Sequence, residues 1–143
     1  MDTRIMRRLR IAAESGEAAA QFNLGVLYDS RLDDNGYAVE GDRAEALKWL
    51  LAAAEQGLPR AQKMLAELYA AGPNAWGNYV NACAWFLLAS ANSRGIHREQ
   101  ARSGYQRIAA KLTQAQRARA KGLARVWRAR SREIPQFSEG QAQ

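Results

Sequence analysis

The sequence is poor in the residue types that build disulfides, metal sites and active sites. Its 143 residues include one Cys and one His. Because Cys83 has no second thiol to pair with, an intramolecular disulfide is excluded, and one thiol cannot by itself make a zinc site. Nothing in the sequence therefore ties the fold to an oxidising compartment, and little material for catalysis is present.

The chain also lacks a long apolar run. The longest stretch without a charged residue, from Leu68 to Ser93, contains glycine, proline and several asparagines, and its apolar part is too short to cross a bilayer. The N-terminal segment is positively charged, but residues 13–17 (Ala-Glu-Ser-Gly-Glu) interrupt it before the apolar region of a signal peptide can form. We therefore expect a cytoplasmic protein, with a trimmed N-terminus as the open alternative.

Negative charge is scarce in the last third of the chain. Residues 1–90 carry 9 Lys and Arg against 11 Asp and Glu, whereas residues 91–143 carry 12 against 3, so the net charges are −2 and +9. The formal charge of +7 is therefore a property of the C-terminal segment. Such a segment suits an acidic protein, a nucleic acid or an anionic membrane surface, and it is also typical of a solvated helix face.

An internal repeat organises the chain. Matches occur at one offset of 41 residues: residues 12–16 with 53–57, Gln21 with Gln62, Leu24 with Leu65, and Tyr28 with Tyr69. A second set recurs at an offset of 36, residues 46–51 with 82–87, so the five missing residues must lie in the loop between the helices of the unit. Periods of this size are typical of helical solenoids.

Each unit is predicted to form two helices. Apolar side chains at helical spacing mark the first helix, where Gly25, which is Ala66 in the next copy, permits close approach of a neighbouring helix. The second helix is expected to begin with a capping-box-like pair, Asp42 and Glu45, and to end at Gly57.

Further caps and the composition complete the expected secondary structure. Asn78 takes the cap position in the next copy, Thr113 with Gln116 forms another capping box, and Trp49 and Trp85 are expected to fill the volume between helix pairs. With 29 Ala and few β-branched residues, the chain should be all-α. The expected helices cover residues 3–14, 18–30, 43–56, 59–71, 79–92, 97–112 and 114–132.

The repeat resembles the Sel-one-like repeat (SLR), a relative of the tetratricopeptide repeat. In the first copy the matching residues are Ala12, Gly16, Ala20, Gln21, Leu24, Gly25, Tyr28, Val39, Asp42, Ala46, Trp49, Ala53 and Ala54. The second copy keeps Gly57, Ala61, Gln62, Leu65, Tyr69, Gly72, Ala82, Trp85 and Ala89, but has Ala66 for the glycine and Asn78 for the aspartate. The segment from Arg98 to Trp127 looks like the closing helices of short bacterial SLR proteins.

The resemblance implies an all-α, right-handed superhelix, which is an α-solenoid of antiparallel helix pairs. We expect a single domain over residues 1–143. It divides into a half repeat (3–16), two repeats (17–57 and 58–95), C-terminal capping helices (96–132) and a tail (133–143).

The resemblance also implies a function, because SLR proteins are adaptors that bind proteins or peptides and typically have no catalytic activity of their own. Stacked helix pairs generate an extended concave surface. If first helices line it, as in tetratricopeptide repeats, an extended segment with an acidic end would bind there through Arg and Lys, unless these positions are ordinary solvated residues. The predicted peptide-binding residues are Phe22, Asn23, Val26, Asp29, Arg60, Lys63, Met64, Glu67, Arg98 and Arg102, with Tyr105 continuing the surface.

The C-terminal helix offers an alternative function. On a helical wheel, Leu112, Leu123, Val126 and Trp127 gather on one side and Arg117, Lys121, Arg125, Arg128 and Arg132 on the other, while Arg119 and Arg130 fall on the apolar side and would have to snorkel. The inner position of the tryptophan predicts a docked helix rather than a free arm. This basic face is either a solvated cap or a site for an acidic protein, a nucleic acid or another anionic surface. Nucleic acid is the less favoured partner, because the face lacks the aromatic side chains on which single-stranded bases stack.

No motif predicts an enzyme, a metal site or a cofactor. Residues 31–42 fit a calcium-loop template poorly, since Arg31 holds the first ligand position and Asp42 replaces the bidentate Glu. Cys83 aligns with Leu47 of the previous copy and should be a small buried residue, and His97 should be solvent-exposed or capping. No glycine-rich phosphate loop occurs. We therefore expect a chain with no catalytic residues, no bound metal and no cofactor.

Overall fold

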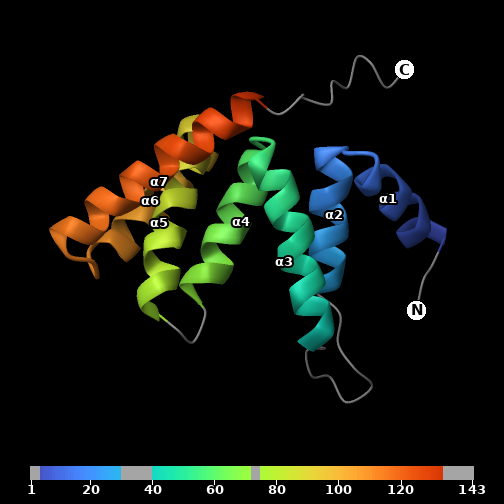
Figure 1. Cartoon of the computed structure of the whole chain (residues 1–143), viewed down its shortest axis with the longest axis horizontal. Helices are drawn as coiled ribbons and strands as arrows, with labels where there is room; N and C mark the ends of the chain where they lie inside the picture. Colours follow the sequence, from blue (N-terminus) through green and yellow to red (C-terminus); the bar gives the residue numbers. More distant parts are fainter. Residues whose placement is uncertain (1–3, 30–39, 72–74, 134–143) are drawn as a thin grey trace.

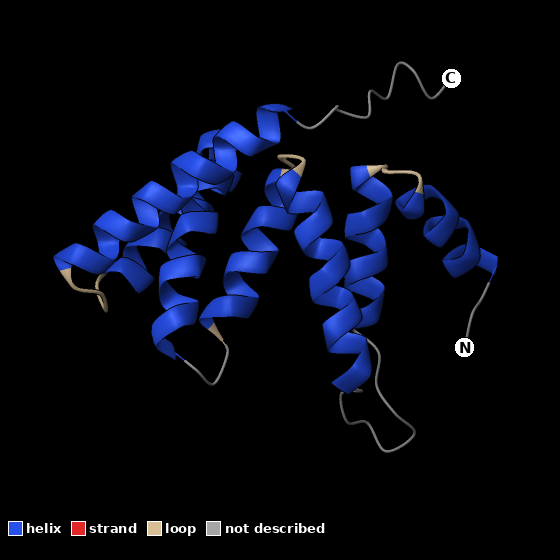
Figure 2. Cartoon of the chain, viewed as in Figure 1, coloured by secondary structure: helices blue, strands red, loops and turns tan. Residues whose placement is uncertain are grey.

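The computed structural model describes the backbone of residues 4–29, 40–71 and 75–133, and the side chains of residues 4–29, 43–71 and 78–131. Within these ranges the chain forms seven α-helices and no strand (Figures 1 and 2), which confirms the predicted all-α class. The helices are α1 (Arg4–Glu14), α2 (Ala18–Asp29), α3 (Glu40–Glu55), α4 (Pro59–Ala70), α5 (Ala75–Asn92), α6 (Gly95–Ala109) and α7 (Gln114–Glu133).

Local chemistry sets the helix ends that the sequence predicts best. Gly57 ends α3 with a φ of 92°, and its N–H donates to the carbonyl of Ala54 at 3.0 Å, while Leu58 N–H donates to the carbonyl of Ala53 at 3.3 Å. Helices commonly end at a glycine in the left-handed conformation, with the N–H groups that follow the helix donating to carbonyls of its last turn. Gly16 does the same after α1, with a φ of 102°.

Helix starts agree less well with the capping residues. The box at Thr113 is confirmed, because Thr113 N–H donates to Gln116 Oε1 at 2.9 Å and Gln116 N–H donates to Thr113 Oγ1 at 3.1 Å. The predicted caps at Asp42 and Asn78 are wrong, since α3 begins at Glu40 and α5 at Ala75 and both residues lie inside their helices. A good capping side chain is compatible with a helix start but does not prevent the hydrogen-bonded turns from continuing upstream.

The helices stack in chain order along the long axis of the molecule (Figure 1), and α2 pairs with α3 as α4 pairs with α5. The closing segment departs from this pattern, because α6 and α7 both pack against α5 and make almost no contact with each other. The chain therefore does not end in a third helix pair. Helix α5 becomes the centre of the C-terminal half, with α4, α6 and α7 around it.

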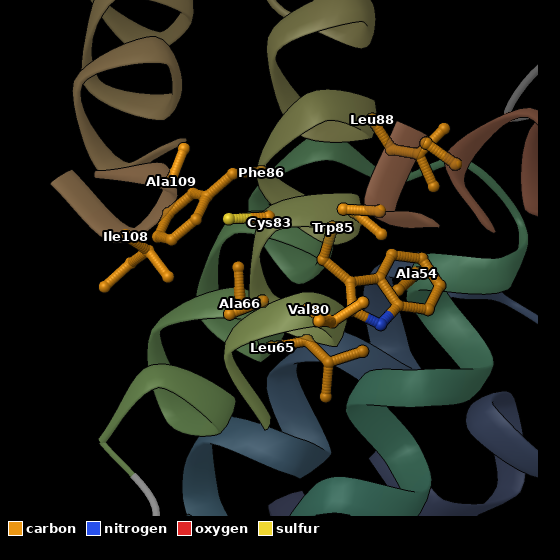
Figure 3. Close-up of a cluster of buried hydrophobic side chains, with 14 of the residues drawn as sticks. Ala54, Leu65, Ala66, Val80, Cys83, Trp85, Phe86, Leu88, Ile108 and Ala109 are labelled. Atoms are coloured by element: carbon orange, nitrogen blue, oxygen red, sulfur yellow. The ribbon is translucent and has the colours of Figure 1, made fainter. Parts of the chain in front are cut away.

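The main core follows from this central position of α5. Five consecutive residues, 82–86, are buried, which is possible only for a helix covered on most sides. Phe86 points from α5 toward Ile108 and Ala109 of α6, whereas Trp85 points away toward Ala54 of α3 (Figure 3). A smaller cluster around Leu24 and Trp49 holds α1, α2 and α3 together.

Two glycines let helices approach closely. A Cβ on Gly25 would lie 2.8 Å from Leu50 Cγ, as expected for a contact residue between α2 and α3. A Cβ on Gly104, which the sequence did not single out, would lie 2.4 Å from Cε1 of Phe86. Carbon atoms pack at about 3.5–4.0 Å, so at both positions the observed packing of the helices requires glycine.

A buried glutamine joins each unit to the one before it. Gln62 Nε2 donates to the carbonyl of Ala54 at 3.0 Å, and Gln62 Oε1 accepts a hydrogen bond from Asn92 Nδ2 at 3.1 Å. Gln21 repeats the arrangement one unit earlier. It donates to the carbonyl of Ala13 at 3.1 Å and accepts a bond of 2.9 Å from Gln56, which directly follows α3. Each amide thus gives a second hydrogen bond to a helix-terminal carbonyl that already accepts one from the glycine after the helix, at Ala54 from Gly57 and at Ala13 from Gly16.

Candidate peptide-binding groove and basic helix

A trench runs between α4 and α6. It consists of two hollows of about 730 and 470 Å³ that share Lys63, Glu67 and Gln100. The first hollow is lined by Leu58, Pro59, Arg60, Lys63, Met64, Glu67, Ser93, Arg94, His97 and Gln100, and the second by Lys63, Glu67, Phe86, Glu99, Gln100, Ser103, Gly104 and Arg107. Because α4 and α6 are the first helices of successive units, the trench lies on the side where a binding surface is expected.

Four of the predicted peptide-binding residues share the α4 wall of this trench: Arg60, Lys63, Met64 and Glu67. Their spacing of three, four and seven residues places them on one face of the helix. Lys63 is central, since its Nζ donates to Gln100 Oε1 at 2.8 Å and lies 3.9 Å from Glu67 Oε1. This lysine therefore bridges the two walls.

The residues predicted on α2 lie beside the trench rather than in it. The guanidinium of Arg60 stands 5.0 Å from the centre of the Phe22 ring, a cation–π contact that links α4 to α2. Asn23 is exposed and Val26 and Asp29 are half-buried on the same helix. None of these three residues lines either hollow.

Arg98, Arg102 and Tyr105 do not line the trench either. Arg98 lies 36 residues after Gln62 and takes its role, because its Nε donates to the carbonyl of Ser90 at 3.2 Å and to that of Ser93 at 2.9 Å. A guanidinium has no acceptor, so Arg98 cannot receive a bond like the one that Gln62 accepts from Asn92 at the end of α5. The series of side chains that bond to the end of the preceding helix, Gln21 and Gln62, therefore ends at Arg98.

The α6 wall contains residues that the sequence prediction missed. Arg94, His97, Glu99, Gln100, Ser103 and Arg107 all line the trench. A signal for three of them was present: the offset of 36, applied to Lys63, Met64 and Glu67, leads to Glu99, Gln100 and Ser103. His97 is exposed, in agreement with one of its two expected roles.

Helix α7 docks through its tryptophan, as predicted. Trp127 stacks on Trp85 with ring centroids 4.4 Å apart and an interplanar angle of 24°. Ala120 and Ala124 are the buried residues of the contact. The prediction that Val126 belongs to the apolar side is wrong, because this side chain is 50% exposed. Small alanines let α7 lie close to α5, so the buried side is narrower than the wheel suggested.

The basic side chains of α7 face solvent. Arg117, Lys121, Arg125 and Arg128 are exposed, whereas the Arg132 side chain lies outside the described residues. Arg119 and Arg130, expected to snorkel from the apolar side, are exposed as well. Six cations of α7 are therefore available to a partner.

A smaller cleft of about 320 Å³ lies where α7 meets α3 and α5. Glu55, Tyr69 and Arg130 line it together with the stacked tryptophans. Burial, and secondly the charge of Glu55, raise the pKa of the Tyr69 hydroxyl. Ser131 Oγ donates to the carbonyl of Glu55 at 2.6 Å and ties the end of α7 to the end of α3.

The thiol is buried, and the described acidic residues form no group that could hold a metal ion. Cys83 is fully buried, and burial raises its pKa to about 11, so the thiol stays protonated near neutral pH. In the described part of the chain, no three His, Cys, Asp or Glu residues gather where they could hold a metal ion. The calcium-like segment lies in residues 31–42, most of which the structure does not describe. None of the described helices combines the length and apolarity needed to cross a membrane.

Comparison with known proteins finds a similar protein of known structure. No family model matches the chain, and no curated protein matches it. Among solved structures, the chain is similar to the crystal structure of a protective antigen present in uropathogenic Escherichia coli strains, which displays an SLR fold. The two share 33% sequence identity over 93% of this chain, with a TM-score of 0.70. The chain spans 28% of the length of that protein.

Proposed function

This chain is a solenoid of Sel-one-like repeats, and we propose that it acts as a non-catalytic adaptor that binds an extended segment of a protein partner in the trench between α4 and α6. The observation that carries the proposal is the trench itself, two adjoining hollows between α4 and α6 that share Lys63, Glu67 and Gln100. Repeat solenoids bind their partners on such extended concave surfaces.

The dimensions of the trench suit an extended peptide. Its α6 wall runs from Arg94 to Arg107, which is about 20 Å at 1.5 Å per helical residue. An extended chain advances about 3.3 Å per residue, so about six residues fit. A segment of this length can place alternate side chains against the walls while its backbone stays accessible to polar groups such as Gln100 and Ser103.

The charges of the trench favour an acidic residue at one end of the segment. Arg60 and Arg94 line the first hollow, and the one carboxylate there, that of Glu67, already lies near Lys63. The contact with Phe22 holds the Arg60 guanidinium in place, so less entropy is lost when a carboxylate binds. Met64 supplies an adaptable apolar surface beside these cations. The preferred segment therefore combines an Asp or Glu with a neighbouring apolar side chain.

Selection from a displayed library of random twelve-residue peptides on the full chain tests this proposal. We expect the selected peptides to be enriched in acidic and apolar residues. Their affinity, measured by fluorescence anisotropy, should fall at least tenfold for Arg60→Glu/Arg94→Glu and also for Lys63→Glu. The matched control is Arg4→Glu/Arg7→Glu, which changes the charge by the same amount at exposed positions of α1 and should leave affinity within twofold.

Two results would contradict the trench assignment. Selected peptides that bind the Arg60/Arg94 variant as tightly as the native chain would show that they bind elsewhere. An equal loss of affinity in the α1 control would show that overall charge, rather than the trench, attracts the peptides. Circular dichroism of each variant checks that the helices are retained, because all the substituted side chains lie at the surface.

A further inference from the structure

Helix α7 is exposed over more than half of its circumference. It contacts α5 and the end of α3 and hardly touches α6. Only a narrow strip, formed by Ala120, Ala124 and the half-buried Leu123 and Trp127, faces the core. A helix with this much of its surface exposed to solvent can enter a concave partner.

The exposed part of α7 has cations on both flanks and small residues between them. At about 100° per residue, Arg117, Lys121, Arg125 and Arg128 form one flank, and Arg119 and Arg130 form the other. The tip between the flanks consists of Ala118, Gly122, Ala129 and the exposed Val126. A Cβ on Gly122 would meet nothing within 4 Å, so no contact inside the molecule requires this glycine.

The six cations have no partner inside the described chain. None of them makes an ion pair there. They extend over about 20 Å of helix, from Arg117 to Arg130. Neighbours at a spacing of four, such as Arg117, Lys121 and Arg125, repel one another and destabilise the helix. An external polyanion would remove this repulsion.

We propose that α7 binds in the major groove of double-stranded DNA, with its two basic flanks against the phosphates of the two strands. The major groove is about 12 Å wide and admits an α-helix. A flat anionic membrane or an acidic helix would engage one flank, whereas a groove has an anionic wall on each side. Because this site lies on α7, it is independent of the trench.

The same geometry disfavours the other nucleic acids. Single-stranded sites need aromatic side chains on which bases stack, and the described exposed face of α7 carries none. The major groove of double-stranded RNA is too deep and narrow for side chains to read. The tip residues carry no side-chain hydrogen-bonding groups, so binding is without sequence preference and comes from phosphate contacts. Because the side chains of the tip are small, the helix can also approach the floor of the groove.

Fluorescence anisotropy of the full chain with a labelled DNA duplex of twenty base pairs tests this proposal. If four to six phosphates are neutralised, log K should fall against log salt concentration with a slope of about −4 to −5. Affinity should therefore drop about 10²-fold to 10³-fold between 50 and 200 mM NaCl. Absence of duplex binding at 50 mM NaCl would overturn the proposal.

Paired substitutions on each flank distinguish binding of α7 in a groove from binding of α7 to a flat surface. Arg117→Gln/Arg128→Gln and Arg119→Gln/Arg130→Gln should each weaken duplex binding at least tenfold at 100 mM NaCl and lower the slope by about 2. The control Arg4→Gln/Arg7→Gln removes the same charge from α1 and should stay within twofold. Loss from only one flank, or an equal loss from the control, would overturn the groove assignment. So would an equal loss from the trench variant Arg60→Glu/Arg94→Glu.

A substitution at the tip tests the depth of insertion without disturbing the fold. Gly122→Glu adds a carboxylate where the helix would face the floor of the groove, and the helix tolerates this change because a Cβ at Gly122 meets nothing within 4 Å. Duplex binding should fall at least tenfold while thermal stability is retained. Retained binding would contradict insertion.

Alternative polyanions complete the test. The single strand of the same sequence, an RNA duplex, poly-L-glutamate and phosphatidylserine vesicles should each bind at least tenfold more weakly than the DNA duplex. Tighter or equal binding of any of them would overturn the choice of partner.

Discussion

The contact between Gly104 and Phe86 supports a sharp prediction about stability. A methyl group at Gly104 would lie 2.4 Å from Phe86 Cε1, 2.7 Å from Cζ and 2.8 Å from Cδ1. Since carbon atoms pack at about 3.5–4.0 Å, α6 or the ring must move by about 1 Å. The Phe86 ring is buried and lies against Ile108 and Ala109 of α6 (Figure 3), so a shift of the ring disturbs that packing.

The size of the effect follows from two opposing contributions. Overpacking a core contact costs about 1–3 kcal/mol, whereas Ala in place of Gly favours a helix by up to about 1 kcal/mol. Gly104→Ala should therefore lower the free energy of unfolding by about 1–2 kcal/mol. Gly122→Ala has the same helical gain and no clash, so it should raise that free energy by about 0.5–1 kcal/mol. Gly25→Ala, whose nearest neighbour is the flexible Leu50 side chain at 2.8 Å, should fall between them.

Urea unfolding followed by circular dichroism measures the order of the three variants. A difference of about 2 kcal/mol between Gly122→Ala and Gly104→Ala corresponds to about 1 M in the urea midpoint for a small protein. Phe86→Leu should cost less in the Gly104→Ala background than in the native chain, because the smaller side chain relieves the clash. Equal midpoints for the Gly104 and Gly122 variants would refute the close approach of α6 to α5.

Two further predictions concern buried polar groups. Gln62→Ala should lower the free energy of unfolding by about 1–3 kcal/mol, because it removes two hydrogen bonds, to the carbonyl of Ala54 and from the amide of Asn92, each worth about 0.5–1.5 kcal/mol. Urea unfolding checks this against the exposed control Gln106→Ala, which should change little. Burial raises the pKa of Cys83 from its ordinary value of 9.0 to about 11, so the unfolded chain releases this proton first. The contribution of the Cys83 thiol to stability should therefore be constant below pH 9 and decline toward pH 11. Thermal unfolding between pH 8 and 10.5 should show a smaller decline for Cys83→Ala, and identical profiles would contradict burial of the thiol.

Features that depend on a few neighbouring residues follow from the sequence alone. The stop at Gly57 depends on one left-handed residue and two hydrogen bonds to the preceding turn. The shared face of Arg60, Lys63 and Glu67 depends only on helical periodicity. The repeat itself is visible as matches at a fixed offset, because each helix pair uses the same small and apolar residues to pack on the next.

Features that depend on how helices meet are decided only in the folded chain. A helical wheel shows which residues of α7 share a side, but the packing on α5 decides how wide the buried side is, and this exposes Arg119, Arg130 and Val126. The role of Arg98 on α6 also differs from the prediction. Its side chain bonds to the carbonyls at the end of α5, as Gln62 does at the end of α3, and does not line the trench.

The difference between the features that the sequence predicts and those that only the folded chain shows has a physical cause. Helix formation and helix ends are decided within about one turn of chain, so composition, spacing and glycine stops reveal them. The packing of α6 and α7 on different faces of α5 results from contacts between distant segments, such as Gly104 with Phe86 and Trp127 with Trp85. Both candidate binding surfaces, the trench beside α6 and the two-flanked α7, depend on that arrangement, although the repeat offset of 36 already relates the two walls of the trench.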